Sequence, residues 1–393
     1  FINHLYRIAR RSASVNYNRR KKEGLAMKEI RTLILVLFCV GILYWFIEPY
    51  AHTKLSPHTD PVNYDFAAGD TALAAHNVAA AESALAAAEK GGDETMIKNS
   101  KKALASAKEQ QDKTVLFWDE INKIDLSKGD AVRGAETFTN AGCTACHGVK
   151  SANIPAPMDA ASASAAYGVN PPDLSSAGYL YTDKFLAALI KDPIMALKLD
   201  QKFGDEKPFP MPGFFGAGGD LNQEIADIVA YLKSLAPSED KLITSEAAAS
   251  GIKQGTELDE AQKKFLLSKA VFEDACLRCH DVKYDKLFAS SDKASLAAYM
   301  GSMPPDLSMM IRSKGANYLH EFINDTQKKL PGTSMPRVGL NENAEAKVVE
   351  YLADVGDSKK AEREATTINI MIYFLILSVF AGLWKSKIWS KLH

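Results

Sequence analysis

Two segments of the same form govern how this chain folds: Cys143-Thr-Ala-Cys146-His147 and Cys276-Leu-Arg-Cys279-His280. In each segment two residues separate a pair of cysteines, and a histidine directly follows the second cysteine. The 393 residues contain only five cysteines, too few for a disulfide scaffold in so long a chain. The fifth, Cys39, lies in an apolar run and is interpreted as a small hydrophobic residue. The spacing of the other four therefore carries the information.

This spacing is the attachment pattern for c-type haem. Two thiols about one helical turn apart can add to the two vinyl groups of one porphyrin, and the adjacent histidine then reaches the iron. A zinc site built from both pairs would join ligands 133 residues apart, and neither it nor a dithiol redox pair needs a histidine after each pair. We predict two covalently bound haem c groups, with His147 and His280 as proximal ligands.

A methionine is the expected sixth ligand of each haem. Met211 stands in Pro-Phe-Pro-Met-Pro-Gly, 64 residues after His147, and Met335 stands in Gly-Thr-Ser-Met-Pro-Arg, 55 residues after His280. Both loops precede a predicted closing helix and can aim a side chain at a haem face. Methionine as the partner of histidine raises the haem potential, whereas a second histidine would lower it.

The remaining candidates for a sixth ligand are weaker. We expect three methionines to pack in cores: Met195, Met309 and Met310. Met303 has Asn170 as its counterpart in the first half, which disfavours it as a ligand. His320 stands on a predicted helix and is expected to face solvent.

One pentapeptide occurs twice, as Pro171-Pro-Asp-Leu-Ser175 and as Pro304-Pro-Asp-Leu-Ser308. Each copy starts 24 residues after its haem histidine. A ligating histidine needs an acceptor for its other ring N–H, and a carbonyl of a rigid proline segment can supply one. We therefore assign the segments that begin at Pro171 and Pro304 to the haem sites, although a simple turn is compatible with the same pattern.

The pattern repeats in two modules, predicted at residues 128–237 and 258–357, with a polar linker at 238–257. Each module has a helix before its cysteine motif and an amphipathic closing helix, at residues 223–235 and 344–355. A composition of 47% hydrophobic and 24% charged residues excludes a disordered chain, a collagen and a polytopic membrane protein.

Apolar runs lie near both ends of the chain, at residues 33–47 and 368–384. We predict transmembrane anchors at 32–48 and 366–385; the alternatives are a cleaved signal for the first and a buried core helix for the second. The flanking basic tails, 1–31 and 386–393, are predicted to be cytoplasmic, which places residues 48–366 outside the cytoplasmic membrane. Met27 would make a natural start, so the role of residues 1–26 stays open.

Residues 49–127 are predicted to form a linker followed by an alanine-rich helical hairpin. Strong helix formers over residues 70–112 flank a single break at Gly91-Gly92. We interpret the hairpin as a spacer or docking arm without chemistry.

Both modules resemble class I c-type cytochromes at these motifs. The second module is also similar to cytochrome c1 of cytochrome bc1 complexes, in its pentapeptide followed by Arg312 and by Gly315-Ala-Asn-Tyr318. The duplicated plan, with Glu-Pro-Tyr-Ala-His after the first apolar run, resembles the dihaem cytochrome c1 variant of bacterial bc complexes. The second module departs from the single-haem form because Met335 is followed by Pro-Arg, as in small class I cytochromes.

The resemblance implies a mainly α fold and a function in the respiratory chain. Arg312 would lie near a haem propionate, and the haem domains would face the periplasm. A Rieske iron–sulfur protein would donate single electrons and a soluble cytochrome c or terminal oxidase would accept them, within a quinol:cytochrome c reductase. A cytochrome b subunit would sit beside the two spans in a dimeric complex, and nucleic acid is not expected as a partner.

Other functions are compatible with two such modules. A dihaem subunit of a terminal oxidase or of a periplasmic dehydrogenase would contain the same motifs. A dihaem cytochrome c peroxidase would need one haem with an open sixth position. The first module could also be a docking module whose haem lies off the main electron path.

Charge is divided unequally along the chain despite a formal net charge of -1. Residues 48–366 carry 35 basic and 46 acidic side chains, whereas both tails are basic. An acidic segment outside the membrane predicts electrostatic attraction to a basic soluble partner.

Overall fold

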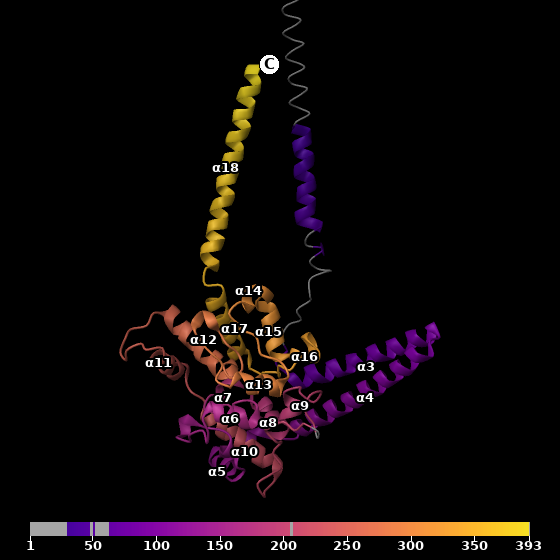
Figure 1. Ribbon diagram of the computed structural model, residues 1–393, viewed down its shortest axis with the longest axis vertical. Coiled ribbons are helices and arrows are strands. Elements are labelled where there is room, and N and C mark those ends of the chain that lie inside the picture. The colour runs from indigo at the N-terminus through magenta and orange to yellow at the C-terminus, as the bar shows by residue number, and fades with distance from the viewer. Residues whose placement is uncertain (1–29, 48–49, 52–62, 205–206, 393) are drawn as a thin grey trace, which may run out of the picture. The chain divides into compact units, whose positions relative to one another are not determined.

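The computed structural model describes residues 30–47, 50–51, 63–204 and 207–392 (Figure 1). It divides into two compact units, Phe1–Asp60 and Pro61–His393. Within the described residues the regular structure is helical, and the extended pairings are two isolated bridges, which join Val149 to Ile154 and Val282 to Leu287. The predicted mainly α fold is confirmed.

Each unit contains one apolar helix with exposed side chains. In the first unit the helix covers Ile30–Ile47 and ends in a π-helical turn, η1 (Leu43–Ile47). The second unit ends in α18 (Lys360–Leu392). Both helices are long and apolar enough to cross a membrane, and neither is buried, which excludes a core helix at the C-terminal end. α18 extends beyond the predicted span 366–385, and most of the predicted tail 1–31 lies outside the described residues.

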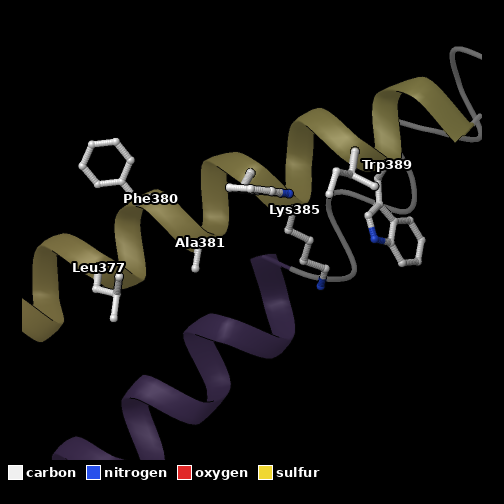
Figure 2. A pocket seen from close by; sticks show the side chains of 7 residues that line it. Leu377, Phe380, Ala381, Lys385 and Trp389 are labelled. Carbon is white, nitrogen blue, oxygen red and sulfur yellow. The ribbon is translucent and has the colours of Figure 1, made fainter.

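Aromatic and basic side chains gather toward the C-terminal end of α18. Figure 2 shows the side chains of Leu377, Phe380, Ala381, Lys385 and Trp389 along this part of the helix. The Lys385 ammonium lies 5.7 Å from the centre of the Trp389 ring. Tryptophan and lysine together are typical of the zone where a spanning helix leaves the hydrocarbon.

The alanine-rich segment forms the predicted hairpin, which consists of α3 (Phe66–Gly91) and α4 (Glu94–Asn122), packed side by side (Figure 1). α3 ends because Gly92 adopts the left-handed conformation, with φ 73°, and Asp93 caps α4 by accepting two backbone N–H groups. The predicted break is confirmed, but both helices extend beyond residues 70–112.

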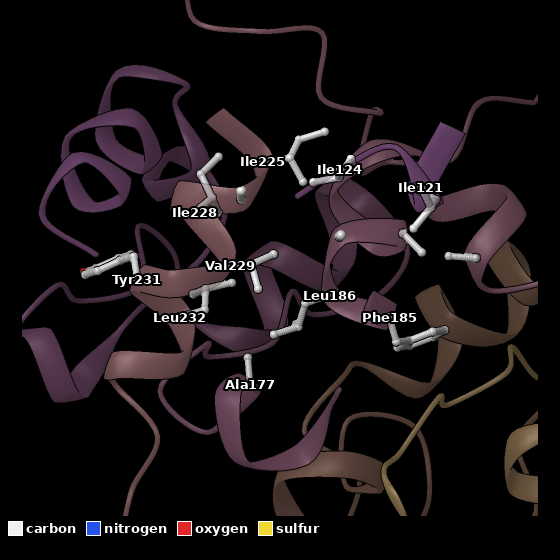
Figure 3. Close-up of a cluster of buried hydrophobic side chains, with 14 of the residues drawn as sticks. Ile121, Ile124, Ala177, Phe185, Leu186, Ile225, Ile228, Val229, Tyr231 and Leu232 are labelled. Atoms are coloured by element: carbon white, nitrogen blue, oxygen red, sulfur yellow. The ribbon is translucent and has the colours of Figure 1, made fainter. Parts of the chain in front are cut away.

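The base of the hairpin belongs to the core of the first module. Its buried aromatic and aliphatic side chains join the cluster formed by the helices of that module: Phe66, Phe117, Trp118, Ile121 and Ile124. Figure 3 shows Ile121 and Ile124 beside core residues such as Phe185 and Leu186. The hairpin is therefore not a free arm at this end, because a boundary at residue 127 would divide a single core.

The first module surrounds the motif Cys143–His147. Its elements are α5 (Ala131–Asn140), η2 (Leu126–Lys128), η3 (Cys143–Ala145), η4 (Lys150–Ala152), α6 (Ala160–Tyr167), α7 (Ala177–Leu180), α8 (Asp183–Lys191), α9 (Pro193–Ala196) and α10 (Leu221–Ser234). α5 packs closely against α10 at Gly134. A Cβ at this position would lie 1.9 Å from the carbonyl oxygen of Asp227, which is too close for any side chain. The glycine thus permits the contact between the helix before the haem motif and the closing helix.

The second module surrounds the motif Cys276–His280. Its elements are α12 (Glu260–Cys276), η5 (Lys283–Asp285), α13 (Lys293–Met300), α14 (Met310–Lys314), α15 (Ala316–Asn324), α16 (Thr326–Lys329) and α17 (Glu342–Gly356). α11 (Glu239–Ala249) packs on α12, so the segment 238–257, predicted as a linker, contains a helix of its own. The buried side chains of Leu242 and Ala247 hold this helix in place.

The two modules repeat in register over a long stretch. α6 and α13, α8 and α15, and α9 and α16 each begin 133 positions apart, the same separation as His147 and His280. Asn153 and Lys286, also 133 positions apart, both adopt the left-handed conformation, with φ 58° and 57°. The next segments differ in length, because Met335 follows Met211 by 124 positions.

Candidate haem sites

The two cysteine motifs fold into the same tight turn. The backbone amide of His147 donates to the carbonyl of Cys143 at 3.0 Å, and that of His280 donates to the carbonyl of Cys276 at 3.1 Å. Residues four apart in such a turn lie on one face, so the first cysteine and the histidine of each motif face the same side.

Three of the motif thiols lie in surroundings that favour the neutral form. Burial raises the pKa of the Cys143 and Cys279 thiols, and it raises the pKa of Cys276 to about 12. Metal ligands and redox dithiols act as thiolates, which an apolar site disfavours. Within the described parts of the chain, no three His, Cys, Asp or Glu residues come together as a metal site, and none of the four cysteines is in a disulfide. The arrangement suits thioether attachment better than a shared zinc site.

Each histidine is held by one backbone carbonyl from the repeated pentapeptide. His147 Nδ1 lies 2.9 Å from the carbonyl oxygen of Pro172, and His280 Nδ1 lies 2.8 Å from that of Pro305. A carbonyl can only accept, so Nδ1 carries the proton and Nε2 is left bare for an iron. Burial lowers the pKa of both rings, which favours the neutral imidazole that ligates metals.

The carbonyl in question belongs to the second proline of each pentapeptide. Pro171 and Pro304, the residues named from the sequence, each stand one position before it. Their fixed φ angles set the direction from which the next carbonyl approaches the ring.

The other residues of the pentapeptide fasten it to the loop after the histidine. Leu174 N donates to the carbonyl of Gly148 and Leu307 N to that of Asp281, both at 2.9 Å. The Ser175 hydroxyl accepts the amide of Ser151, as the equivalent serine of the second module accepts the amide of Tyr284. In both modules, therefore, hydrogen bonds of the leucine amide and the serine hydroxyl hold the proline segment beside the histidine.

The two methionine loops are anchored at matching places. Phe214, three residues after Met211, donates its amide to the carbonyl of Ile190 at 2.9 Å. Val338, three residues after Met335, donates to the carbonyl of Ile323 at 3.0 Å. Ile190 and Ile323 are 133 positions apart, so the two loops are anchored to equivalent points on α8 and α15. Both methionines are half-buried.

The structure changes two expectations about the weaker candidates. Met309 is not a core residue, since 43% of its surface is exposed and its sulfur accepts the hydroxyl of Tyr284. His320 does not simply face solvent, because its Nδ1 lies 3.1 Å from a carboxylate oxygen of the buried Glu345. Met195 and Met310 pack against the two cores, as predicted, and Met303 is exposed.

Arg312 lies on α14 with its side chain exposed. Its charge helps to lower the pKa of Asp357, chiefly lowered by the hydrogen bond from Arg363. A contact between Arg312 and a propionate stays a prediction.

The motifs of the two modules meet at Asn170, directly before Pro171. Its amide donates to the Ser291 hydroxyl at 3.0 Å, and its carbonyl accepts Arg278 Nη1 at 3.4 Å. Arg278 stands inside the second cysteine motif, so the segment that holds His147 contacts the haem-binding turn of the other module. Sequence reasoning missed Arg278, although a charged residue between the two cysteines was a usable signal.

Buried polar atoms test whether these sites fit a haem. Arg278 Nε and Tyr299 Oη are buried and have no hydrogen-bond partner among the described residues. An anionic group such as a propionate would satisfy donors of this kind. The paired thiols, the oriented imidazoles and these donors together fit a covalently bound haem.

The comparisons with known proteins agree with this chemistry for the first module. The family model described as cytochrome c matches residues 131–236. A solved chain titled "Hyperthermophilic respiratory Complex III" is 20% identical to this one, over 38% of this chain and 86% of that chain, with a TM-score of 0.28. A likeness this low carries no argument. No curated protein matches this chain.

Residues 131–236 are a cytochrome c domain. For this domain, the family match confirms the predictions of covalently bound c-type haem and of electron transfer.

Proposed function

We propose that this chain is a membrane-anchored dihaem c-type cytochrome, the cytochrome c1 subunit of a quinol:cytochrome c reductase. It passes single electrons from a Rieske iron–sulfur protein to a soluble cytochrome c or a terminal oxidase. The observation that carries the proposal is the recurrence of one set of ligand-holding contacts in both modules.

The second haem is supported by geometry rather than by the family match, which covers the first module. The second module keeps the cysteine turn, the carbonyl at 2.8 Å from His280 Nδ1 and the anchored loop of Met335. A carbonyl that fixes the tautomer of a buried imidazole serves a ligand histidine. The repetition of every part at matched positions favours a second working site over a remnant.

The residues of each module have separate tasks. When haem is bound, His147 and His280 would hold the iron through Nε2, and Met211 and Met335 would supply the thioether ligands. Bound haem iron supplies a one-electron couple that no side chain offers. The pentapeptide fixes the ring orientation, and the methionine side raises the potential relative to a second histidine. Both rings are buried, so little water would reach them when the haem is bound.

Partners and location follow from the resemblance to cytochrome c1. The two apolar helices anchor the chain in the cytoplasmic membrane beside a cytochrome b subunit, with the haem modules on the periplasmic side. By the same resemblance, Arg312 would lie near a propionate of the second haem. A dimeric complex is expected, as in that family.

The nearest alternatives differ in partners or in ligation. A dihaem subunit of a terminal oxidase or dehydrogenase would not be accompanied by a Rieske protein. A peroxidase would leave one sixth position open, whereas both methionine loops are anchored in the same way. This shared anchoring disfavours the peroxidase.

Native purification from membranes tests the proposal. A tag on the chain should copurify a b-type cytochrome and a Rieske protein, identified by mass spectrometry and by their spectra. The isolated complex should reduce soluble cytochrome c with a quinol. Copurification of oxidase or dehydrogenase subunits, with neither expected partner, would overturn the assignment to a reductase.

A further inference from the structure

The two methionine loops differ sharply two residues after the methionine. In the first module this position is Gly213, where a Cβ would lie 2.6 Å from the carbonyl oxygen of Lys191. In the second module it is Arg337, whose Nε donates at 2.9 Å to the equivalent carbonyl, that of Asn324. Arg337 is only 1% exposed. A buried guanidinium needs a charged partner, because an unpaired one would be costly.

That partner is Asp70, from helix α3 of the hairpin. Arg337 Nη1 donates to Asp70 Oδ2 at 2.8 Å, and Nη2 donates to the other carboxylate oxygen. Asp70 is itself 4% exposed and also accepts the indole N–H of Trp118 at 3.1 Å. The guanidinium lies 4.9 Å from the centre of the Phe66 ring. The hairpin therefore encloses the arginine with a bidentate acceptor and an aromatic face.

The first module completes this buried cluster. Lys198 Nζ lies 2.7 Å from Asp70 and 3.2 Å from Asp325, so two cations face two carboxylates. Lys198 adopts the left-handed conformation, with φ 55°, which is uncommon for a residue other than glycine. Its neighbour Leu197 accepts the backbone amide of Arg337 at 3.0 Å. Hairpin, first module and second module thus meet at Arg337.

Other contacts of the Met335 loop, residues 333–341, also come from the first module. The Lys202 ammonium donates to the hydroxyl of Ser334, next to Met335. Asn341 N donates to the carbonyl of Leu180 at 2.9 Å. In the Met211 loop, residues 207–219, the Glu224 carboxylate of the same module accepts two backbone amides after the methionine. The start of this loop reaches the second module, where Lys207 Nζ donates to the carbonyl of Tyr299 at 2.7 Å. The two loops are thus anchored at equivalent positions, but different contacts hold the rest of each loop.

We propose that Asp70 and Arg337 are positioning residues for Met335, through which the hairpin holds the sixth ligand of the second haem in place. The inference rests on the proposed ligation of that haem by Met335. Without the Asp70 carboxylate the buried guanidinium keeps only a more distant charged partner, Asp325, at 3.9 Å from Nη2. We expect it to shift, and with it the loop whose methionine is two residues away. The hairpin is then a part of the second haem site rather than a spacer.

The test uses the full-length holoprotein in detergent. Asp70→Asn removes the charge with little change of shape. Glu82→Gln is the matched control, because it breaks the hairpin's exposed ion pair with Lys108. Met211→Ala and Met335→Ala identify the signal of each haem. The readouts are carbon monoxide binding to the reduced haems, the methionine–iron absorption band of the oxidised haems, and a redox titration that resolves both potentials.

We expect Asp70→Asn to weaken or remove the sixth ligand of the same haem that loses its ligand in Met335→Ala. That haem should bind carbon monoxide, lose its methionine–iron band and titrate at a lower potential, while the other haem and the helical circular dichroism stay unchanged. Glu82→Gln should alter neither haem. Unchanged ligation in Asp70→Asn, or equal changes at both haems, would overturn the inference.

A second variant covers the case in which Asp70→Asn fails to fold. Arg337→Lys keeps the charge but loses the bidentate fork, so we expect a smaller shift of the same haem in the same direction. An Arg337→Lys protein with two unaltered haems would overturn the inference. If Met335→Ala itself leaves both haems unaltered, the ligand assignment fails and the inference fails with it. A Met335→Ala effect without an Asp70→Asn effect contradicts the positioning role alone.

Discussion

His280 Nδ1 lies 2.8 Å from the carbonyl oxygen of Pro305, in a segment fastened to the loop that follows the histidine. The same relationship recurs between His147 and Pro172 at 2.9 Å. A backbone acceptor cannot be removed by substitution, so the contacts that hold the segment in place are the accessible test of its importance.

Ser308→Ala should loosen the pentapeptide of the second module. The Tyr284 amide loses its acceptor at 3.1 Å, which should lower the free energy of unfolding by about 1 kcal/mol. Thermal denaturation of the holoprotein measures the change. Ser313→Ala is the control, because that hydroxyl bonds within its own short helix and is exposed. Equal stabilities of the two variants would contradict the role assigned to Ser308.

Gly134→Ala should separate the helix before the first haem motif from the closing helix. The added Cβ would lie 1.9 Å from the carbonyl oxygen of Asp227, which is backbone and cannot turn aside. We expect a loss of about 3 kcal/mol in the free energy of unfolding, as for overpacked cores. Gly91→Ala, with no atom within 4 Å of its Cβ, should leave stability unchanged or slightly raised. A Gly134→Ala protein as stable as the parent would refute the close packing.

Stability should depend on pH through Glu273 on α12. Burial, reinforced by the charge of Glu246, raises the pKa of Glu273 from 4.5 to about 7, although Lys269 opposes the shift. The folded state therefore binds the proton more tightly than the unfolded state. This contribution to stability is complete below pH 4.5 and is lost as the pH rises through about 7.

Glu273→Gln should remove this dependence. The free energy of unfolding of the variant minus that of the parent should be larger at about pH 8 than at about pH 5. Denaturant unfolding of both proteins at each pH measures this difference. Glu260→Gln, on the exposed first turn of the same helix, should show no such trend. A stability difference that is constant across this range would contradict the raised pKa.

Reaction with a basic soluble cytochrome c should be sensitive to salt. Residues 48–366 carry an excess of acidic side chains, which attracts a basic partner at low ionic strength. Stopped-flow measurement of the second-order rate should show a fall as salt increases. A rate independent of ionic strength would contradict the predicted attraction.

Patterns that act locally were predictable from the sequence. The spacing of Cys276, Cys279 and His280 dictates a single turn, and a pentapeptide at a constant distance from each histidine predicted a shared contact. The break at Gly91-Gly92 predicted the hairpin because glycine ends helices. In each case the partners are close in the chain or repeat within it.

Long-range pairings were not predictable in this way. Asp70 and Arg337 are 267 positions apart. Arg337 stands in the Met335 motif, but nothing in the sequence near either residue indicates that the two pair. The segment that contains α11 was predicted as a linker because it is polar. In the structure a narrow face of α11, which includes Leu242 and Ala247, is buried. Met309 was expected in a core but lies at an exposed helix start, where tertiary packing decides its surroundings.

Two haems on one chain should be visible directly in the intact mass of the natively purified holoprotein. Mass spectrometry under denaturing conditions retains only covalently attached groups. We predict a mass that exceeds that of the polypeptide by two haems. The excess should fall to one haem when Cys276 and Cys279 are both replaced by alanine. A native chain that carries a single haem, or none, would contradict it.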